Sequence, residues 1–399
     1  MPEPKLTRFL LLPKLELLNF SHIPRSKTLI FQCETNSSCA HCPYCGEKSS
    51  RVHDKRVVTI IDAPYSGKKK LLKIEKKRFR CQKLHCKRVF TESVPGIAKR
   101  GRITERMQRE ILYTADRFAN MKAVQAHTKL GNKTIYKKHY DQLELEWRKR
   151  KNDPWPKTIG IDEHSFIRNK KYGNREFCTV IVDYKNERVR ELIPGRTSGH
   201  LQMALQYIPG KANVKNVVLD LSKPYKSFAQ EFFPNAKLIA DHFHVIRLLN
   251  PHINKARKEV TGDKRKLLVR KYLLMNAKKK LDYWTRHELL KWLRQHPKLE
   301  ELYLAKESLH KLYRCKGRER ARRSLKKLLD VLAFSKYKEL QTLRRTLMSW
   351  KEEILNYFEN RITNARTEGF NNVCKQIQRR AYGYKNFKNY RLKVLYACR

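Results

Sequence analysis

The chain has 399 residues, and its 90 lysines and arginines outnumber its 38 aspartates and glutamates, which gives a formal net charge of +52. An ordinary metabolic enzyme has no use for such a charge, whereas a protein that binds nucleic acid through its phosphates does. A hydrophobic share of 40% excludes a disordered basic tail, and no apolar run is long enough to predict a membrane-spanning helix. We therefore expect a cytoplasmic protein of two or three domains that binds DNA or RNA and no membrane.

The first 100 residues contain two cysteine pairs. Cys42 and Cys45 stand in C-P-Y-C-G, where the glycine lets the backbone turn under a metal, and Cys81 and Cys86 form a wider pair. Alternating runs between the pairs predict strands. We expect residues 1–100 to be an N-terminal region with a zinc ribbon, whose structural Zn²⁺ is bound by these four cysteines. The nearby Cys39 and His85 compete as ligands, and four buried free thiols are the alternative.

Residues 101–150 are predicted to be helical. Apolar residues at helical spacing indicate a helix from about residue 103, and a short helix, a turn at Leu130–Asn132 and a basic helix follow. This order predicts a helix-turn-helix that binds DNA, with a plain helical hairpin as the alternative. The side chains expected to face DNA are Lys133, Thr134, Lys137 and Lys138.

Residues 157–249 have a clear α/β pattern of three strands, a helix, a strand, a helix and a strand. This is the element order of the ribonuclease H-like fold, in which the first and fourth strands are neighbours. Asp162 is predicted at the carboxyl end of the first strand and Asp220 at that of the fourth, so their carboxylates should meet. Asp241 and His244 end the fifth strand nearby. They are candidate accessory residues, with a helix-capping aspartate and a packed histidine as the alternative.

Residues 250–355 are predicted to be a basic, all-helical insertion. Residues 251–350 carry 29 lysines and arginines against 10 acids, a formal charge of 29 − 10 = +19, and leucines and aromatic residues recur at helical spacing. We expect this insertion to flank the catalytic face and to bind DNA phosphates without reading bases. The cations expected to do so are Lys278, Lys279, Lys280, Arg318, Arg322 and Arg323.

Residues 356–399 should return to the catalytic domain with a helix over residues 363–384. One face is predicted to be buried, through Phe370, Val373, Cys374, Ile377 and Ala381. Another face carries Glu368, Asn372 and the DNA-binding candidates Lys375 and Arg379, and Asn364 is a candidate N-cap. The predicted fold is thus multidomain α/β: a zinc ribbon, a helix-turn-helix and a ribonuclease H-like mixed sheet split by an all-α insertion.

With these motifs, the sequence resembles the bacterial insertion-sequence transposases of the DDE class, and within them the ISL group. The resemblance lies in GIDEHS around Asp162, VVLDLSKPY around Asp220, ADHFHV around Asp241 and TNARTEGFNNVCKQIQRRAYGY around Glu368. It implies that Asp162, Asp220 and Glu368 are the catalytic triad. It also implies a bacterial, nucleoid-associated protein that acts, as a homodimer, on the terminal inverted repeats of its element and on target DNA.

Phosphodiester cleavage and strand transfer need these groups for a chemical reason. Two Mg²⁺ ions can activate the attacking oxygen and stabilise the leaving one, and three carboxylates can hold them because Mg²⁺ prefers oxygen ligands. We expect Asp162 to bridge the two ions and Asp220 and Glu368 to bind one each. Two alternatives remain at this point: a ribonuclease H-like nuclease or resolvase without strand transfer, and a zinc-ribbon regulator without catalysis.

Overall fold

The computed structural model describes residues 12–99, 101–118, 120–168, 175–262 and 268–399. The chain divides into two compact units, Met1–Glu146 and Trp147–Arg399. The molecule is mixed α/β, as the sequence predicts. Among the described helices, none combines the length and the apolar character that crossing a membrane requires.

The first unit is built on an antiparallel hairpin of two long strands. Strands β5 (Val52–Tyr65) and β6 (Lys68–Arg80) are joined by Ser66 and Gly67, both with positive φ, which is the turn that suits the right-handed twist of paired strands. The sheet order is β1-β2-β6-β5, with β7 paired to β6. The remaining strands are β1 (Leu15–Ile23), β2 (Thr28–Thr35) and β7 (Val89–Thr91), and a separate two-stranded sheet consists of β3 (Ala40–His41) and β4 (Lys48–Ser49).

Three helices follow: α2 (Glu105–Arg117), α3 (Met121–Thr128) and α4 (Asn132–Arg150), the last of which runs past the end of the first unit at Glu146. The side chain of Thr104 caps α2 by accepting a hydrogen bond from the backbone N–H of Met107. A buried carboxylate fixes α2 to the sheet, because Asp62 on β5 accepts hydrogen bonds from Thr104 and Arg106 and pairs with Lys70 on β6 at 3.0 Å. The predicted short helix, turn and basic helix are α3, Lys129–Gly131 and α4.

The second unit contains a five-stranded mixed sheet of order β10-β9-β8-β11-β12. The strands are β8 (Thr158–Arg168), β9 (Arg175–Asp183), β10 (Arg188–Pro194), β11 (Asn216–Leu219) and β12 (Lys237–Ala240). β8, β9 and β10 pair antiparallel, and β8, β11 and β12 pair parallel. The first strand of this unit therefore lies beside its fourth, as the sequence predicts.

One strand boundary differs from the prediction. Asp162 does not end β8, because β8 continues to Arg168 in register with β9. It is β11 that ends at this level, since Leu219 pairs with Ile161. Asp162 consequently lies within a strand, at the point where the parallel neighbour stops.

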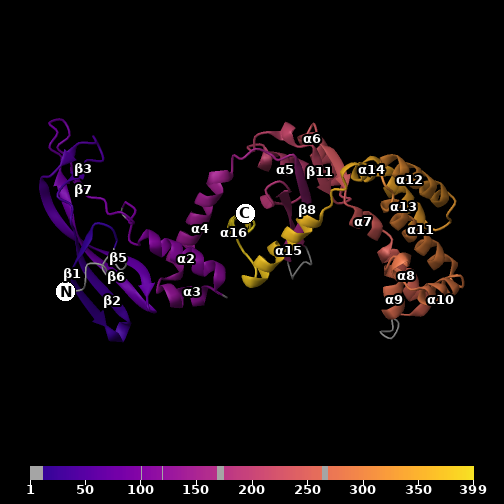
Figure 1. Ribbon diagram of the computed structural model, residues 1–399, viewed down its shortest axis with the longest axis horizontal. Coiled ribbons are helices and arrows are strands. Elements are labelled where there is room, and N and C mark those ends of the chain that lie inside the picture. Colours follow the sequence, from indigo (N-terminus) through magenta and orange to yellow (C-terminus); the bar gives the residue numbers. More distant parts are fainter. Residues whose placement is uncertain (1–11, 100, 119, 169–174, 263–267) are drawn as a thin grey trace. The chain divides into compact units, whose positions relative to one another are not determined.

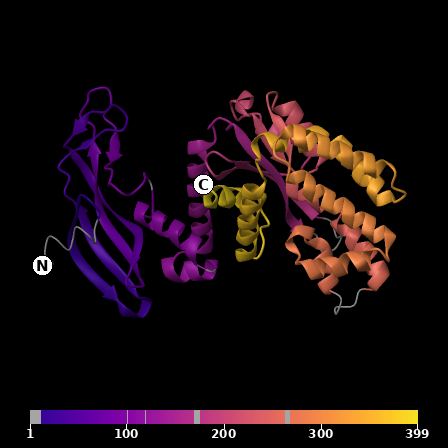
Figure 2. The same cartoon turned by 45° about the vertical axis from the view of Figure 1, so that its right-hand side comes forward.

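Helices cover this sheet and extend beyond it (Figure 1, Figure 2). Two helices lie between the strands, α5 (Ser198–Leu205) and α6 (Lys223–Phe232), and α7 (His242–Arg247) follows the last strand. The helical segment that follows contains α8 (Asn250–Thr261), α9 (Leu268–Met275), α10 (Tyr283–Leu293), α11 (Pro297–Tyr313), α12 (Arg318–Ala333), α13 (Lys338–Ser349) and α14 (Lys351–Asn360). One hydrophobic core joins these helices to the sheet. α14 packs on β12, where Asn356 Nδ2 donates a hydrogen bond to Leu238 O.

The chain then returns to the sheet as α15 (Ala365–Arg380), which packs on β8 and β9, and ends in α16 (Phe387–Ala397). α15 is shorter than the helix predicted over residues 363–384. It stops where Tyr382 and Gly383 adopt positive φ. Cys374 is buried as predicted, but Ala381 is exposed because it lies beyond the last helical turn.

Candidate active site and cysteine cluster

The four predicted cysteine ligands converge in the first unit. Cys42 and Cys45 lie between β3 and β4, and Cys81 and Cys86 follow β6; their sulfur atoms all lie within 4.8 Å of one another. The sulfur atoms of Cys42 and Cys86 are 3.7 Å apart, close to the roughly 3.8 Å expected around a tetrahedral Zn²⁺ with Zn–S bonds of about 2.3 Å. Burial raises the pKa of the Cys42 thiol, but backbone N–H groups of Tyr44 and Cys45 outweigh it and lower that pKa to about 7.

Burial instead raises the pKa of Cys81 to about 12, so the Cys42 thiolate is favoured in this way and the Cys81 thiolate is not. Four sulfur atoms that converge on one point suit a zinc ion with no open position. The same geometry separates these four cysteines from the two alternative ligands. Among the residues that the structure describes, Cys39 and His85 lie outside the cluster.

In the second unit, the pairing of β8 with β11 places Asp162 and Asp220 next to each other. Leu219 pairs with Ile161, and the next residue on each strand is one of the two aspartates. Asp162 is only 8% exposed. Its burial and then the nearby charge of Asp220 raise the pKa of Asp162 to about 7. The two predicted carboxylates are thus together, in a setting that disfavours two adjacent negative charges.

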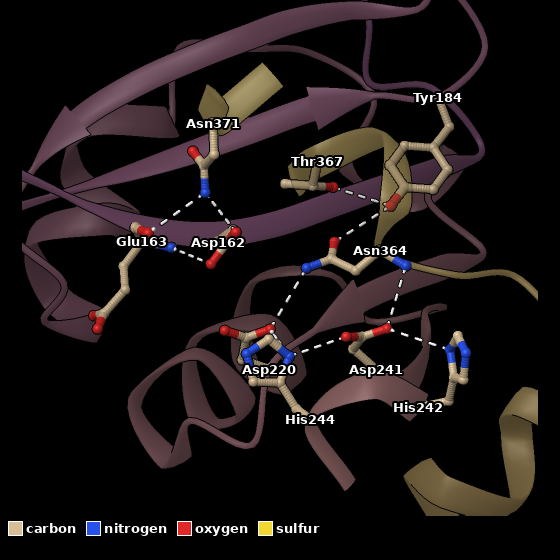
Figure 3. Close-up of polar contacts among 10 residues, drawn as sticks. All are labelled: Asp162, Glu163, Tyr184, Asp220, Asp241, His242, His244, Asn364, Thr367 and Asn371. Atoms are coloured by element: carbon tan, nitrogen blue, oxygen red, sulfur yellow. Dashed lines mark hydrogen bonds and ion pairs between the residues drawn. The ribbon is translucent and has the colours of Figure 1, made fainter. Parts of the chain in front are cut away.

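Asp241 and His244 complete this edge of the sheet (Figure 3). Asp241 directly follows β12 and is fully buried, and its side chain does not cap α7. His244 Nδ1 lies 2.9 Å from Asp220 Oδ1 and 2.9 Å from Asp241 Oδ2, and these hydrogen bonds raise the pKa of His244 to about 10. Burial raises the pKa of Asp241, but the His242 imidazole 3.6 Å away and the hydrogen bond with His244 outweigh it and hold that pKa below its usual range. A histidine cation between two carboxylates is therefore part of the site.

Two side-chain amides, one at the N-cap of α15 and one within it, donate hydrogen bonds to these aspartates. That role was not predicted from the sequence. Asn371 Nδ2 donates to Asp162 Oδ2 and also to Glu163 O at 3.4 Å. Asn364 Nδ2 donates to Asp220 Oδ1 at 3.5 Å, and the Asn364 backbone N–H donates to Asp241 Oδ1 at 3.4 Å. Asn364 occupies the N-cap position as predicted, but its side chain makes no capping bond. The available signal was the helical spacing of Asn364, Thr367 and Asn371.

A glycine allows α15 to lie this close to β8. A Cβ atom on Gly160 would stand 2.7 Å from the Tyr184 ring and 2.8 Å from its hydroxyl, and closer still to Thr367 Oγ1. The Tyr184 hydroxyl donates to Thr363 O at 3.0 Å and lies 3.0 Å from Thr367 Oγ1. Burial raises the pKa of Tyr184 to about 12, so the phenol stays protonated as a donor. Gly160, Tyr184 and Thr367 together seat the helix.

Glu368 lies on α15 beside the amides that contact the aspartates. At about 100° per residue, its direction on the helix is about 40° from that of Asn364 and about 60° from that of Asn371. It is half-buried. Its carboxylate makes no hydrogen bond or ion pair with the described part of the chain, where the tight acid–imidazole group consists of Asp220, Asp241 and His244. The structure therefore brings Asp162 and Asp220 together and leaves Glu368 at the rim.

The cations predicted to contact DNA divide into exposed and paired ones. On α4, Lys133, Thr134 and Lys137 are exposed and Lys138 is half-buried. On α15, Lys375 and Arg379 are exposed; burial and then the charge of Lys375 lower the pKa of His164 to about 4, so Lys375 lies near β8.

In the helical segment, two of the six predicted arginines and lysines are tied to acids. Arg318 pairs with Glu352 at 2.6 Å and with Glu359 at 3.0 Å, and Arg322 pairs with Glu319 at 3.0 Å. Their charges are partly neutralised within the protein. The expectation that they serve DNA phosphates is weakened for Arg318 and Arg322.

Comparison with known sequences agrees with this geometry. A sequence model of a transposase family, the DDE transposases of the ISL3 group, matches residues 159–394, and one for the zinc finger of the transposases of IS204, IS1001, IS1096 and IS1165 matches residues 39–86. The transposase for insertion sequence element IS1001 of Bordetella parapertussis is 24% identical over 384 residues, which cover 92% of this chain and 91% of that protein. The first match spans the sheet, the helical segment and α15, and the second spans the four clustered cysteines. The chain therefore belongs to the ISL3 group of DDE transposases, and it is a DNA transposase with an N-terminal zinc ribbon.

Proposed function

We propose that Asp162, Asp220 and Glu368 are the carboxylates with which this transposase cleaves DNA strands and joins them to a target. The observation that carries the proposal is the amide contact of α15 with both aspartates. Those contacts position the helix that bears Glu368 over the edge where β8 and β11 bring Asp162 and Asp220 together. Glu368 stands within one helical turn of both amides, half-buried at the rim, where a third carboxylate could still reach bound metal and DNA.

The donor set fits two Mg²⁺ ions. Asp162, Asp220 and Glu368 offer only carboxylate oxygens. The pKa of Asp162 is raised first by burial and then by the charge of Asp220, and divalent cations would relieve the repulsion between these like charges. We propose that Asp162 binds both ions and that Asp220 and Glu368 bind one each. When bound, the ions would activate the attacking oxygen, first of water and then of the freed 3′-hydroxyl, and stabilise the leaving oxygen.

The surrounding residues of the chain orient these ligands. Asn371 Nδ2 donates to Asp162 Oδ2 and the Glu163 backbone N–H donates to Asp162 Oδ1 at 2.7 Å, so both oxygens of this carboxylate are oriented. Protonated His244 holds Asp220 by one oxygen against Asp241. Lys375 and Arg379, exposed on the same helix as Glu368, would bind phosphates of the reacting strand.

We further propose how the rest of the chain serves the reaction. Helices α3 and α4 would form a helix-turn-helix, with Lys133, Thr134, Lys137 and Lys138 facing the terminal repeats of the element. The sheet of the second unit has the strand order of a ribonuclease H-like catalytic domain, with residues 157–249 as its first part, residues 250–355 as a helical insertion and residues 356–399 as its return. Two ends of an element must react together, which favours a homodimer on DNA.

The test is cleavage of a labelled DNA duplex that carries one end of the element, with Mg²⁺, by the variants Asp162→Asn, Asp220→Asn and Glu368→Gln. Each should bind the duplex like the unsubstituted protein and lose at least roughly a hundredfold in cleavage rate, because several kcal/mol of charge stabilisation depend on each metal. Glu163→Gln is the matched control, since this neighbouring carboxylate instead faces Arg196 at 3.3 Å.

One result would change the assignment. If Glu368→Gln cuts at the normal rate while Asp241→Asn does not, Asp241 is the third metal ligand and Glu368 is not. Joined products in the presence of a target plasmid, rather than nicks alone, test the strand-transfer step.

A further inference from the structure

Helix α10 begins with two large aromatic rings in solvent. Tyr283 is 60% exposed and Trp284 is 74% exposed, and their ring centroids lie 5.3 Å apart at 84°. The other four of the five tryptophans are buried or partly buried in the core. Tryptophan buries more apolar surface than any other side chain when it is packed, so a ring left in water at a fixed place is typical of a binding surface.

The protein holds these rings in place. Asp282 caps α10 by accepting a hydrogen bond from the Thr285 backbone N–H at 2.9 Å, and Leu289 and Leu293 anchor the helix in the core. His287 stacks on Tyr283 with ring centroids 6.4 Å apart. The Arg286 guanidinium also lies over the Tyr283 ring, at 5.8 Å. The pair is therefore a rigid platform that needs no reordering when a ligand arrives.

A row of ammonium groups stands directly before the platform. Lys278, Lys279 and Lys280 form a 3-10 turn, and Glu307 fixes it by accepting a hydrogen bond from the Lys278 backbone N–H at 3.0 Å. Residues 278–288 carry four lysines and arginines and two acids, so their formal charge is 4 − 2 = +2. Of the two acids, Asp282 caps the helix and Glu288 lies 3.6 Å from His287 Nδ1.

We propose that residues 278–287 bind an unpaired DNA strand, with nucleobases stacked on Tyr283 and Trp284 and phosphates bound by Lys278–Lys280. An aromatic platform next to a row of cations is the arrangement by which proteins bind single-stranded nucleic acid, since every base has a face that can stack. Bases of an intact duplex already stack on each other, so the ligand must be a frayed, flipped or single-stranded segment. Strand cleavage at an element end supplies such a segment, and in this sense the inference rests on the proposed function.

The charge of the chain argues against the other occupant, a second copy of the protein. Each copy carries +52, so a lysine-flanked surface would meet like charge on its partner. The position of α10 fits a strand led away from the reacting phosphate. α10 packs on α11, and α11 packs on α7, the helix that begins directly after Asp241, so the platform is connected to the acidic edge through two packed helices (Figure 1).

The experiment compares two fluorescein-labelled probes bound to the full chain, an oligothymidylate of roughly 16–20 nucleotides and a duplex of the same length. Trp284→Ala should weaken binding of the oligothymidylate roughly five- to a hundredfold, since stacking contributes about 1–3 kcal/mol per base and 1.4 kcal/mol is a factor of ten. Its affinity for the duplex should stay within about twofold. Trp284→Phe should retain most of the single-strand affinity and lose the quenching of tryptophan fluorescence by the oligothymidylate.

Phe334→Ala is the matched control, because this ring is 91% exposed at the end of α12 and has no lysine turn before it. It should change neither affinity, and thermal melting verifies that each variant is folded. If the affinity of Trp284→Ala for oligothymidylate equals that of the unsubstituted protein or that of Phe334→Ala, the platform does not bind DNA bases. If Trp284→Ala instead lowers the mass seen by light scattering, the surface joins two copies and the inference is wrong. If the unsubstituted protein does not bind the duplex at all, the proposed function itself is wrong.

Discussion

Replacing Gly160 with alanine should separate α15 from β8 and disable the active site. The added Cβ would stand 2.7 Å from the Tyr184 ring and 2.8 Å from the Tyr184 hydroxyl, whereas ordinary contacts lie at 3.4–4 Å. Neither neighbour can give way at little cost. Tyr184 is buried and bonded to Thr363 O, and Thr367 belongs to the helix itself.

The overlap with Tyr184 is roughly 0.6–1.3 Å and that with Thr367 on α15 is larger, so α15 has to move, and overpacking of this kind costs about 1–3 kcal/mol. In a unit of this size, each kcal/mol of lost stability lowers the melting temperature by about 2–4 °C, so the variant should melt roughly 2–12 °C lower. The same movement displaces Asn371 and Glu368 from Asp162. A misplacement of about 1 Å can reduce a reaction rate roughly a hundredfold.

Calorimetry measures the melting temperature of the second unit, and Mg²⁺-dependent cleavage of a duplex with one element end measures the reaction rate. Gly199→Ala is the control, because Gly199 lies in α5 with no atom within 4 Å of its added Cβ, and alanine there should stabilise the helix by about 0.5–1 kcal/mol. A Gly160→Ala protein that melts with this control and cuts DNA at the normal rate would show that the close packing of α15 on β8 does not build the site.

Three further predictions concern the zinc ribbon, the buried carboxylate of the first unit and the helical segment. Cys42→Ser should remove about one zinc per chain in metal analysis and lower the melting temperature of the first unit, whereas Cys39→Ser should do neither. Asp62→Asn should reduce the free energy of unfolding by about 3 kcal/mol at pH 7, because it removes the buried charge that pairs with Lys70 at 3.0 Å and accepts a hydrogen bond from Thr104. Burial raises the pKa of Asp62, but the Arg106 hydrogen bond and the charge of Lys70 outweigh it and lower that pKa in the folded state. The stabilisation is therefore complete above the unfolded pKa of about 3.9 and is lost as the pH falls through the folded pKa. Denaturant titrations in which the variant is less stable by the same amount at pH 3 and pH 7 would contradict this. Lys279→Ala should weaken binding to all duplexes alike and reduce the slope of log affinity against log salt by about 1. Arg322→Ala should have a smaller effect on both, because Glu319 already pairs with that guanidinium. A change of sequence preference at constant slope would show that the segment reads bases.

The sequence predicted the sheet order and the meeting of Asp162 with Asp220 because both follow from local patterns. Apolar runs define the strands, and each aspartate stands directly after the apolar part of its strand. The length of β8 was not predictable in the same way. The three residues after Asp162 are polar, and the strand continues through them because β9 pairs with them.

Other parts of the site depend on contacts between distant segments. Asn371 in a helix reads as a surface amide until β8 is placed beneath it. The choice between Cys86 and His85, adjacent in sequence, is made by the chain direction after β6 rather than by spacing. The end of α15 was misjudged because Tyr382 takes a left-handed conformation that its residue type rarely adopts.

The hydrogen bond from the Asn371 amide to Asp162 joins residues 209 positions apart, and this has a consequence for synthesis of the protein. Ribosomes add about 5–20 residues per second, so roughly 10–40 s pass between the emergence of Asp162 and that of its partner on α15. During that interval the nascent chain carries its aspartates without the helix that positions them. The nuclease therefore cannot be assembled on an unfinished polypeptide, and contacts of such long sequence separation also make its formation one of the late, slow events of folding.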